Sequence, residues 1–372
     1  MLPRRRPVVR VLPLLLCALL VGCGLSGAAP LDPGVRRAVA DWSSAPPARL
    51  AGIPLEGWSY EVTSVRRDGD RALARARLHY RLTGHDAAPA ESVREVDLAR
   101  DGGTWRVTGD RPAPGAPPQL WDQGEPTVVR GAHALVLGVG QTRGTLSAIA
   151  AEADRAVPAV GAAWPGPWAG RVVVLVPGTL DAMAALLGQP PAAYRGMGAV
   201  TTGKAGTGPA PADRVVVNPE GYAQLSGAGR RIVLTHEVTH VATRAATTAE
   251  TPLWLSEGFA DWVAYRDTAS TPAEAAPALG RAVRRGELPA ALPSNEAFAF
   301  GGDPDALARA YEGSWLACRL IAAKWGDATL VRLYESAGRE PLPTALAETI
   351  GGDQAGLTAA WQAALSGELG AP

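Results

Sequence analysis

The feature that most restricts how this chain can fold is the pentapeptide His-Glu-Val-Thr-His at residues 236–240. Residues i and i+4 of an α-helix lie on one face, so two histidines at this spacing can both reach one metal ion from a helix. We therefore expect a helix that begins between Tyr222 and Arg230 and ends near Ala246.

The two histidines lie opposite the apolar stripe of this expected helix. At about 100° per residue, the stripe consists of Leu234, Val238, Val241 and Ala245. A histidine that only fills the core should lie within the stripe, whereas His236 and His240 project from the opposite face of the helix. Glu237 lies at the edge between these two faces. In the pattern H-E-x-x-H, two histidines bind zinc and the glutamate is the general base of a hydrolase, although the pattern also arises by chance.

A second segment supplies further candidate ligands. A catalytic zinc ion needs a third protein ligand and an open position for water. Residues 254–262 (WLSEGFADW) follow Thr251 and Pro252, which we expect to be the N-cap and the first residue of a helix. Glu257 comes seventeen positions after His240, and Asp261 shares its helix face at i+4.

Together the two segments resemble the gluzincin clan of zinc metallopeptidases, which includes thermolysin and aminopeptidase N-like enzymes. The resemblance rests on H-E-x-x-H followed by W-L-x-E-G-x-A, although the connection between the two helices is shorter here than in well-known members. It implies that Zn²⁺ is the cofactor, held by His236, His240 and Glu257. It also implies that Glu237 is the general base and that Asp261 orients His236.

The same resemblance points to two further parts of a site. Tyr311, in a predicted helix over 304–325, matches a tyrosine that can donate a hydrogen bond to the tetrahedral oxyanion; Tyr265 and Tyr334 are weaker alternatives. Residues 198–201 match the edge strand that pairs with the substrate backbone, although an ordinary strand and loop would explain them as well.

The first thirty residues have the pattern of an export signal. Basic residues 4–6 precede an uncharged run over 11–24, and Leu20-Val21-Gly22-Cys23 looks like a bacterial lipobox. We expect residues 1–23 to be a lipoprotein signal peptide and Cys23 to be lipidated. The protein would then be anchored in the cell membrane on its extracytoplasmic face. The alternatives are a plain cleaved signal and an uncleaved anchor. Cys318 lies in an apolar run and is expected to be buried.

The remaining sequence predicts an α+β protein of two domains. Residues 31–115 read as a helix followed by antiparallel strands, similar in pattern to nuclear-transport-factor-like modules, and a Pro/Gly-rich boundary covers 111–118. Residues 120–372 read as a zincin-like domain with a mixed sheet, the H-E-x-x-H helix and a mostly helical C-terminal part. Its predicted strands are 132–137, 171–176, 199–201 and 214–217.

Composition excludes some partners and functions. The formal net charge is zero and there is no basic stripe, so nucleic acid is not an expected partner. Of the five histidines, His79 and His85 have no ligand-like partners at useful spacing and are expected to be surface or strand histidines. His133 stands alone and is expected to be structural.

We expect a zinc-dependent peptidase that acts on a peptide or protein substrate. A catalytically inactive zinc-binding surface lipoprotein, serving as a binding module, is one alternative, and a different hydrolysis on the same site is another. No acidic residue follows Gly198-Ala199-Val200 to hold a free α-amine, which favours an endopeptidase, or a peptidase of undefined type, over an aminopeptidase.

Overall fold

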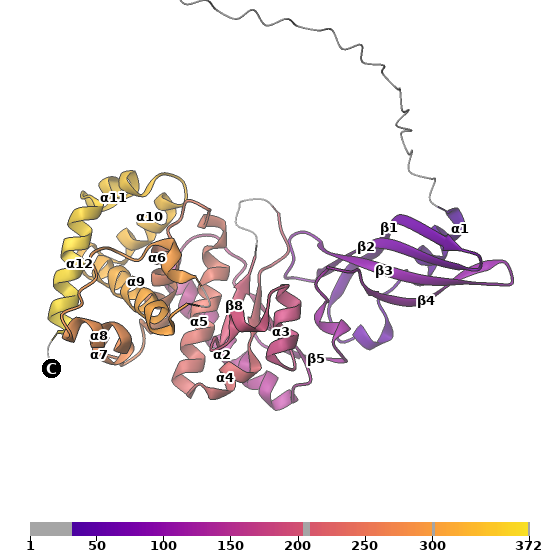
Figure 1. The fold of residues 1–372 in the computed structure, drawn as a ribbon, viewed down its shortest axis with the longest axis horizontal. Coiled ribbons are helices and arrows are strands. Elements are labelled where there is room, and N and C mark those ends of the chain that lie inside the picture. Colours follow the sequence, from indigo (N-terminus) through magenta and orange to yellow (C-terminus); the bar gives the residue numbers. More distant parts are fainter. Residues whose placement is uncertain (1–31, 204–208, 300–301, 371–372) are drawn as a thin grey trace, which may run out of the picture.

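The computed structural model describes residues 32–203, 209–299 and 302–370. It has the expected α+β architecture: an N-terminal antiparallel sheet, a mixed sheet, and a mostly helical C-terminal part. The N-terminal sheet and the C-terminal helices lie at opposite ends of the long axis, with the mixed sheet between them (Figure 1). None of the described helices is both long and apolar enough to cross a membrane. The expected signal peptide and Cys23 lie outside the described residues.

The N-terminal part is a helix packed on a four-stranded meander. Helix α1 (Pro33–Trp42) precedes strands β1 (Leu55–Asp68), β2 (Arg71–Leu82), β3 (Ala90–Asp101) and β4 (Thr104–Pro112), which pair in that order. Burial along β2 alternates, with Ala74, Ala76 and Leu78 fully covered. This alternation is the reason the segment forms a strand with one face in the core.

The second sheet has five strands in the order β5-β6-β7-β9-β8. Strands β6 (Ala134–Val139), β7 (Val172–Val176) and β9 (Arg214–Val217) are parallel, whereas β5 (Pro126–Arg130) and β8 (Ala199–Thr202) pair antiparallel at the two edges. The sequence prediction omitted β5, and it placed β6 two residues too early. Strand β8 lies at an edge, as predicted for residues 198–201.

The middle of this sheet is buried on both faces, which explains its nearly continuous apolar strands. Along β6, Ala134 and Val136 pack into the core that contains the helices. Leu135 and Leu137 face the other way and belong to the same apolar cluster as the N-terminal sheet. The N-terminal part therefore shares a core with the second sheet.

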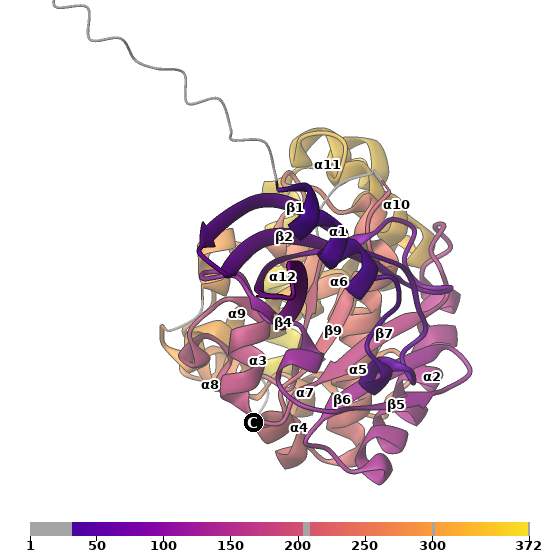
Figure 2. The same cartoon turned by 90° about the vertical axis from the view of Figure 1, so that its right-hand side faces the viewer.

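Most of the helices cover the other face of the sheet or form the C-terminal part, and they lie behind the N-terminal strands in Figure 2. Helix α3 (Leu180–Leu187) is an exception, because its Leu186 packs against the cluster that contains the N-terminal sheet. Helix α5 (Gly227–Thr243) contains residues 236–240, and the helices around it are α2 (Arg143–Ala163), α6 (Leu253–Tyr265) and α9 (Pro304–Trp325). The others are α4 (Pro219–Gln224), α7 (Pro272–Ala275), α8 (Pro277–Arg284), α10 (Asp327–Ala337), α11 (Leu342–Ile350) and α12 (Gln354–Leu369).

The start of the motif helix lies between Tyr222 and Arg230, as predicted, whereas two other expectations about helix ends were wrong. The motif helix α5 begins at Gly227, because Ser226 accepts a hydrogen bond from the backbone N–H of Gly229 as its N-cap, and α4 is a separate helix before it. Helix α5 ends at Thr243, so Ala245 lies in a following 3₁₀ turn, exposed, and is no part of an apolar stripe. Helix α6 begins at Leu253, so Pro252 is its N-cap, and Thr251 precedes the cap.

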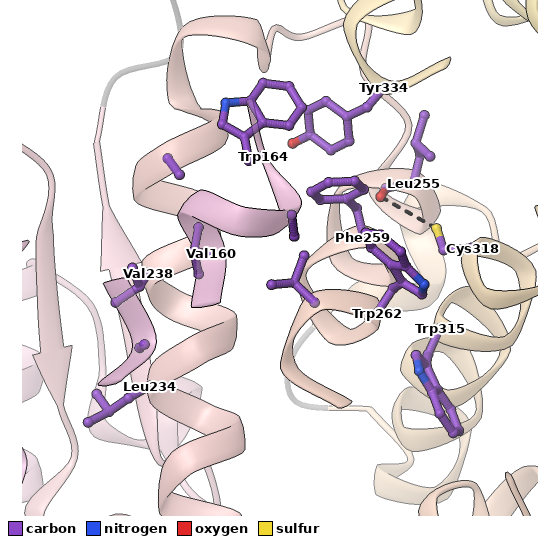
Figure 3. Packing of buried hydrophobic residues seen from close by; sticks show 14 of the residues in the cluster. Val160, Trp164, Leu234, Val238, Leu255, Phe259, Trp262, Trp315, Cys318 and Tyr334 are labelled. Carbon is purple, nitrogen blue, oxygen red and sulfur yellow. Dashed lines mark hydrogen bonds between the residues drawn. The ribbon is translucent and has the colours of Figure 1, made fainter. Parts of the chain in front are cut away.

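Aromatic side chains join α2, α6 and α10 in the core (Figure 3). The ring centroid of Trp164 lies 5.7 Å from that of Phe259 and 5.5 Å from that of Tyr334. Cys318 is fully buried beside α6, with its Sγ 3.9 Å from the carbonyl oxygen of Leu255, as expected for a small core residue. This packing sets the position of α6 relative to the motif helix.

Candidate metal centre

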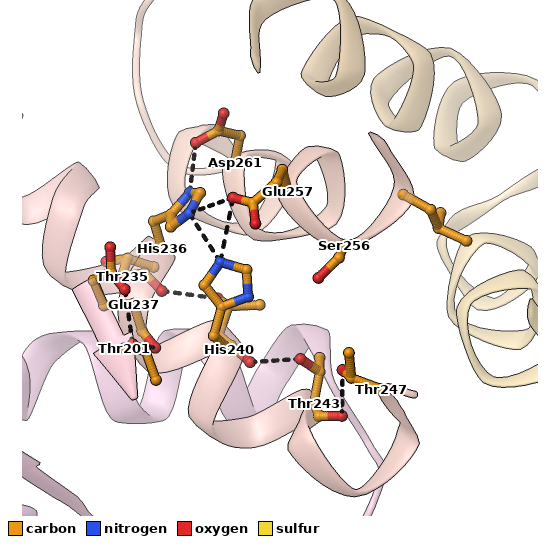
Figure 4. A network of polar contacts seen from close by, with 12 residues as sticks. Thr201, Thr235, His236, Glu237, His240, Thr243, Thr247, Ser256, Glu257 and Asp261 are labelled. Atoms are coloured by element: carbon orange, nitrogen blue, oxygen red, sulfur yellow. Dashed lines mark hydrogen bonds and ion pairs between the residues drawn. The ribbon is translucent and has the colours of Figure 1, made fainter. Parts of the chain in front are cut away.

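Helices α5 and α6 bring three potential ligand atoms to one point. The Nε2 atoms of His236 and His240 are 3.0 Å apart, and Oε2 of Glu257 lies 3.2 Å from the first and 3.4 Å from the second. The side chains converge from the two helices (Figure 4). All three are mostly buried, with exposed fractions of 12%, 16% and 17%. The three residues that the sequence placed at a metal site are thus brought together.

The three atoms fit a tetrahedral metal ion. Zinc binds imidazole nitrogen and carboxylate oxygen at about 2.0–2.2 Å, so two ligand atoms of a tetrahedral site are separated by about 3.3 Å. The three observed separations are within 0.3 Å of this value. Within the part of the chain that the structure describes, these residues form the one group of histidine, cysteine or carboxylate side chains that could hold a metal ion. His79 lies instead between two glutamates on the N-terminal sheet.

Asp261 lies behind the first histidine. Its Oδ1 is 2.7 Å from Nδ1 of His236, so the ring donates its Nδ1 proton to the carboxylate and keeps the lone pair of Nε2 for the metal. Helix α6 supplies both carboxylates because Glu257 and Asp261 are one helical turn apart. The contact has the geometry that the sequence resemblance implied.

The electrostatics of the group favour positive charge at its centre. Burial alone would lower the pKa of His236, but the carboxylates of Asp261, Glu257 and Glu237 outweigh it and raise this pKa well above its usual value. Burial alone would raise the pKa of Glu257, but His240 and His236 hold it below its usual range. A bound cation would take the place of the proton that these carboxylates stabilise.

Glu237 is buried next to the group and held by the edge strand. Oγ1 of Thr201, in β8, lies 2.7 Å from Oε2 of Glu237 and 3.0 Å from its backbone carbonyl oxygen (Figure 4). The hydroxyl therefore donates to the carboxylate expected to be the general base. Thr201 lies in the predicted edge strand, but its contact with Glu237 was not predicted. No spacing rule joins two residues that are 36 positions apart.

Tyr311 borders the same pocket from α9. Its ring centroid lies 6.4 Å from that of His236, and its pKa is raised far above the usual value by burial and by the charges of Glu257, Asp261 and Glu237. The hydroxyl of Tyr311 therefore keeps its proton at neutral pH and can donate a hydrogen bond. Tyr334 is less suitable, because its hydroxyl is buried in the core and lies 2.8 Å from Oγ1 of Thr247.

The other alternative, Tyr265, packs against Trp315 with ring centroids 4.8 Å apart and lines a neighbouring pocket.

The pocket that contains the metal group has a volume of about 760 Å³ and is bordered by β8, α5 and α6. Among its described lining residues, the carboxylates are Glu237, Glu257 and Asp261, all of them engaged in the contacts described above. The arrangement can hold one dication beside a carboxylate base and a hydroxyl donor.

Comparison with known proteins adds only remote likenesses. No protein-family model matches the chain, and no curated protein matches it. A solved two-domain M1 zinc metallopeptidase variant bound to L-arginine is similar with a TM-score of 0.36 and 15% identity, covering 74% of this chain; the chain spans 60% of that protein.

An M1 zinc metallopeptidase variant from Deinococcus radiodurans is also similar, with a TM-score of 0.36 and 11% identity over 87% of this chain and 97% of that one. A variant from the same organism, bound to a Tyr-Ser-Ala substrate, is similar with a TM-score of 0.34 and 12% identity. The match covers 86% of this chain and 95% of that one. The function proposed below therefore rests on the geometry of the site in this chain.

Proposed function

We propose that this protein is a zinc-dependent peptidase. The observation that supports this most strongly is the convergence of His236, His240 and Glu257 on one point, with Glu237 and the edge strand β8 beside it. A purely structural zinc site is closed by four protein ligands. Here three ligands face a pocket, which leaves a position for water.

When bound, a zinc ion lowers the pKa of a coordinated water and polarises the scissile carbonyl. Glu237, next to His236 in sequence, accepts a proton from the water and passes it to the leaving amine. The hydroxyl of Tyr311 donates a hydrogen bond to the oxygen on which negative charge develops. Among the strands that the structure describes, none pairs with the outer edge of β8, and an extended peptide would pair with this edge through backbone hydrogen bonds.

The lining of the pocket favours cleavage within a peptide chain. An aminopeptidase needs a carboxylate to hold the free α-amine of its substrate. Of the carboxylates among the described lining residues, Glu257 and Asp261 belong to the metal group and Glu237 is the proposed base. Thr201, which is not acidic, follows Val200 on the edge strand. We therefore propose an endopeptidase.

We also propose that the protein works outside the cytoplasm, anchored through a lipid on Cys23. The support is the sequence pattern of residues 1–23. Cys23→Ala is expected to move the protein from the membrane fraction to the soluble fraction of its own host. A variant that stays wholly in the membrane fraction would contradict the lipid anchor.

The function is tested by Glu237→Gln, which removes the base and leaves the metal ligands in place. We expect zinc at one ion per chain, measured by elemental analysis, and a loss of peptide hydrolysis of about 10²- to 10⁴-fold. His236→Ala is the matched control and should lose the metal as well. If Glu237→Gln retains full activity on a mixed peptide library, the mechanism is wrong; if the unmodified protein binds zinc but cleaves nothing, the peptidase proposal is wrong.

A further inference from the structure

The N-terminal part reaches the edge of the second sheet through one buried carboxylate. Asp86 follows β2, and its side chain is completely buried. It accepts hydrogen bonds from Nη2 of Arg214 at 2.9 Å and from the backbone N–H of Ala212 at 2.9 Å. It also accepts one from the backbone N–H of Leu82, at 2.7 Å, which ties the turn to its own strand.

Arg214 is the first residue of β9, and it contacts the edge strand. Its backbone carbonyl oxygen lies 3.3 Å from Oγ1 of Thr202 in β8, and the two residues are partners in the strand register. A second link joins the N-terminal part to the residues before β9, because the backbone N–H of Ala88 donates to the carbonyl oxygen of Ala210 at 3.2 Å. The N-terminal part thus holds the β8–β9 pair at the end that contains Thr202 and Arg214.

The β8–β9 pair is also held by the residue that follows the motif helix α5. Oδ2 of Asp213 lies 2.6 Å from Nε of Arg244, which follows α5 and lines the metal pocket. Gly203 is packed against this ion pair so closely that a Cβ atom there would lie 2.0 Å from Oδ1 of Asp213. One residue before Thr202, Thr201 donates to the carboxylate of Glu237. Contacts therefore run without a gap from Asp86 to the expected base.

We propose that the N-terminal part is a positioning module for the site and that Asp86 is a positioning residue, acting through Arg214 on the edge strand that holds Glu237 and receives the substrate. The proposal rests on the peptidase function proposed above. A positioning role follows from the contacts because, within the described part of the chain, β8 pairs with β9 and no other strand, so its place beside the pocket depends on what holds β9. The metal ligands lie on α5 and α6 and do not depend on this link.

The test uses the full-length chain with Asp86→Ala, Arg214→Ala and the double variant. We expect hydrogen–deuterium exchange to become faster in peptides that cover 199–202 and 214–217. We expect kcat/KM for an extended peptide to fall by about 10- to 100-fold, since small misplacements at a site cost that much. Zinc content should stay at the level of the unmodified protein, and the double variant should be no worse than the poorer single variant.

Arg130→Ala is the matched control. Arg130 lies on β5, at the opposite edge of the sheet, and donates to the carbonyl oxygen of Gly52 at 2.9 Å, so its loss also breaks a contact to the N-terminal part. The Arg130→Ala variant should change neither hydrogen–deuterium exchange in the β8–β9 pair nor kcat/KM. If Asp86→Ala misfolds, the more exposed Arg214→Ala supplies the answer.

Unchanged exchange in the β8–β9 pair of both single variants would overturn the proposal, as would faster exchange with unchanged kcat/KM. If the unmodified protein has no peptidase activity, the proposed function fails. The exchange measurement then still decides whether Asp86 holds the strand pair.

Discussion

Around the expected base, a single hydroxyl group joins the edge strand β8 to the carboxylate proposed as the general base. Thr201 lies in the strand that a peptide would pair with, and its Oγ1 donates to the carboxylate of Glu237. A hydrogen bond to a charged group contributes about 1.5–3 kcal/mol. The carboxylate is thereby kept in one orientation next to the metal ligands, although neither Thr201 nor Glu237 is itself one of the three.

Thr201→Val removes the donor and keeps a side chain of similar shape. We expect kcat to fall by about tenfold, which corresponds to about 1.4 kcal/mol of transition-state stabilisation, with little change in zinc content. Thr201→Ser keeps the hydroxyl and should restore most of the activity. Steady-state kinetics on one peptide substrate measure both, and equal activity of the Val and Ser variants would exclude a role for the hydroxyl.

At the level of elements, the site depends on how closely two helices approach. Helix α6 carries Glu257 and Asp261, and α9 carries Tyr311. At Gly258 a Cβ atom would lie 2.3 Å from the backbone carbonyl oxygen of Ser314, and backbone cannot move aside as a flexible side chain can. The glycine next to the third ligand therefore sets the separation of α6 and α9.

Gly258→Ala should force these two helices apart. Overpacking of this kind costs about 1–3 kcal/mol, occasionally more, and the shift is expected to weaken zinc binding because Glu257 is the neighbouring residue. Denaturant unfolding and a zinc titration check the two effects. Gly161→Ala in α2 is the control, because a Cβ atom there meets nothing within 4 Å, and it should be neutral or slightly stabilising. If Gly258→Ala behaves like this control, the glycine does not set the separation of α6 and α9.

At the scale of the whole molecule, the N-terminal part and the second sheet form one hydrophobic unit. Leu135, Leu137 and Val139 of β6 and Val173 of β7 belong to the cluster that includes the N-terminal sheet. All four are nearly fully buried. The two parts of the chain are thus not independent modules joined by a linker, although a Pro/Gly-rich stretch connects them.

Deletion of residues 32–112 would therefore expose one face of the second sheet. Burying a Val or Leu side chain contributes about 1.5–3 kcal/mol, so four such residues account for roughly 6–12 kcal/mol. We expect the truncated chain to aggregate or to bind a hydrophobic dye strongly, measured by size-exclusion chromatography and dye fluorescence. A truncated chain that is monomeric and as thermally stable as the full-length protein would contradict the shared core.

The sequence alone determined the local parts of the site. His236 and His240, and likewise Glu257 and Asp261, are pairs at i and i+4, and helix geometry places such pairs on one face whatever the rest of the fold does. The apolar runs of β6 and β7 likewise predicted buried strands. The α+β architecture followed from these patterns. The end of α5 at Thr243 and the start of α6 at Leu253 were misplaced, because periodicity indicates the face of a helix and not its ends.

Only the tertiary structure decided how these parts meet. The contact of Thr201 with Glu237, the approach of α6 to α9 at Gly258, and the buried bond between Asp86 and Arg214 all join residues far apart in the chain. No periodicity relates such residues, because their distance depends on the packing of whole elements. The local pattern could therefore predict which side chains come together as possible metal ligands, and the fold decided what holds them and the neighbouring Glu237 in place.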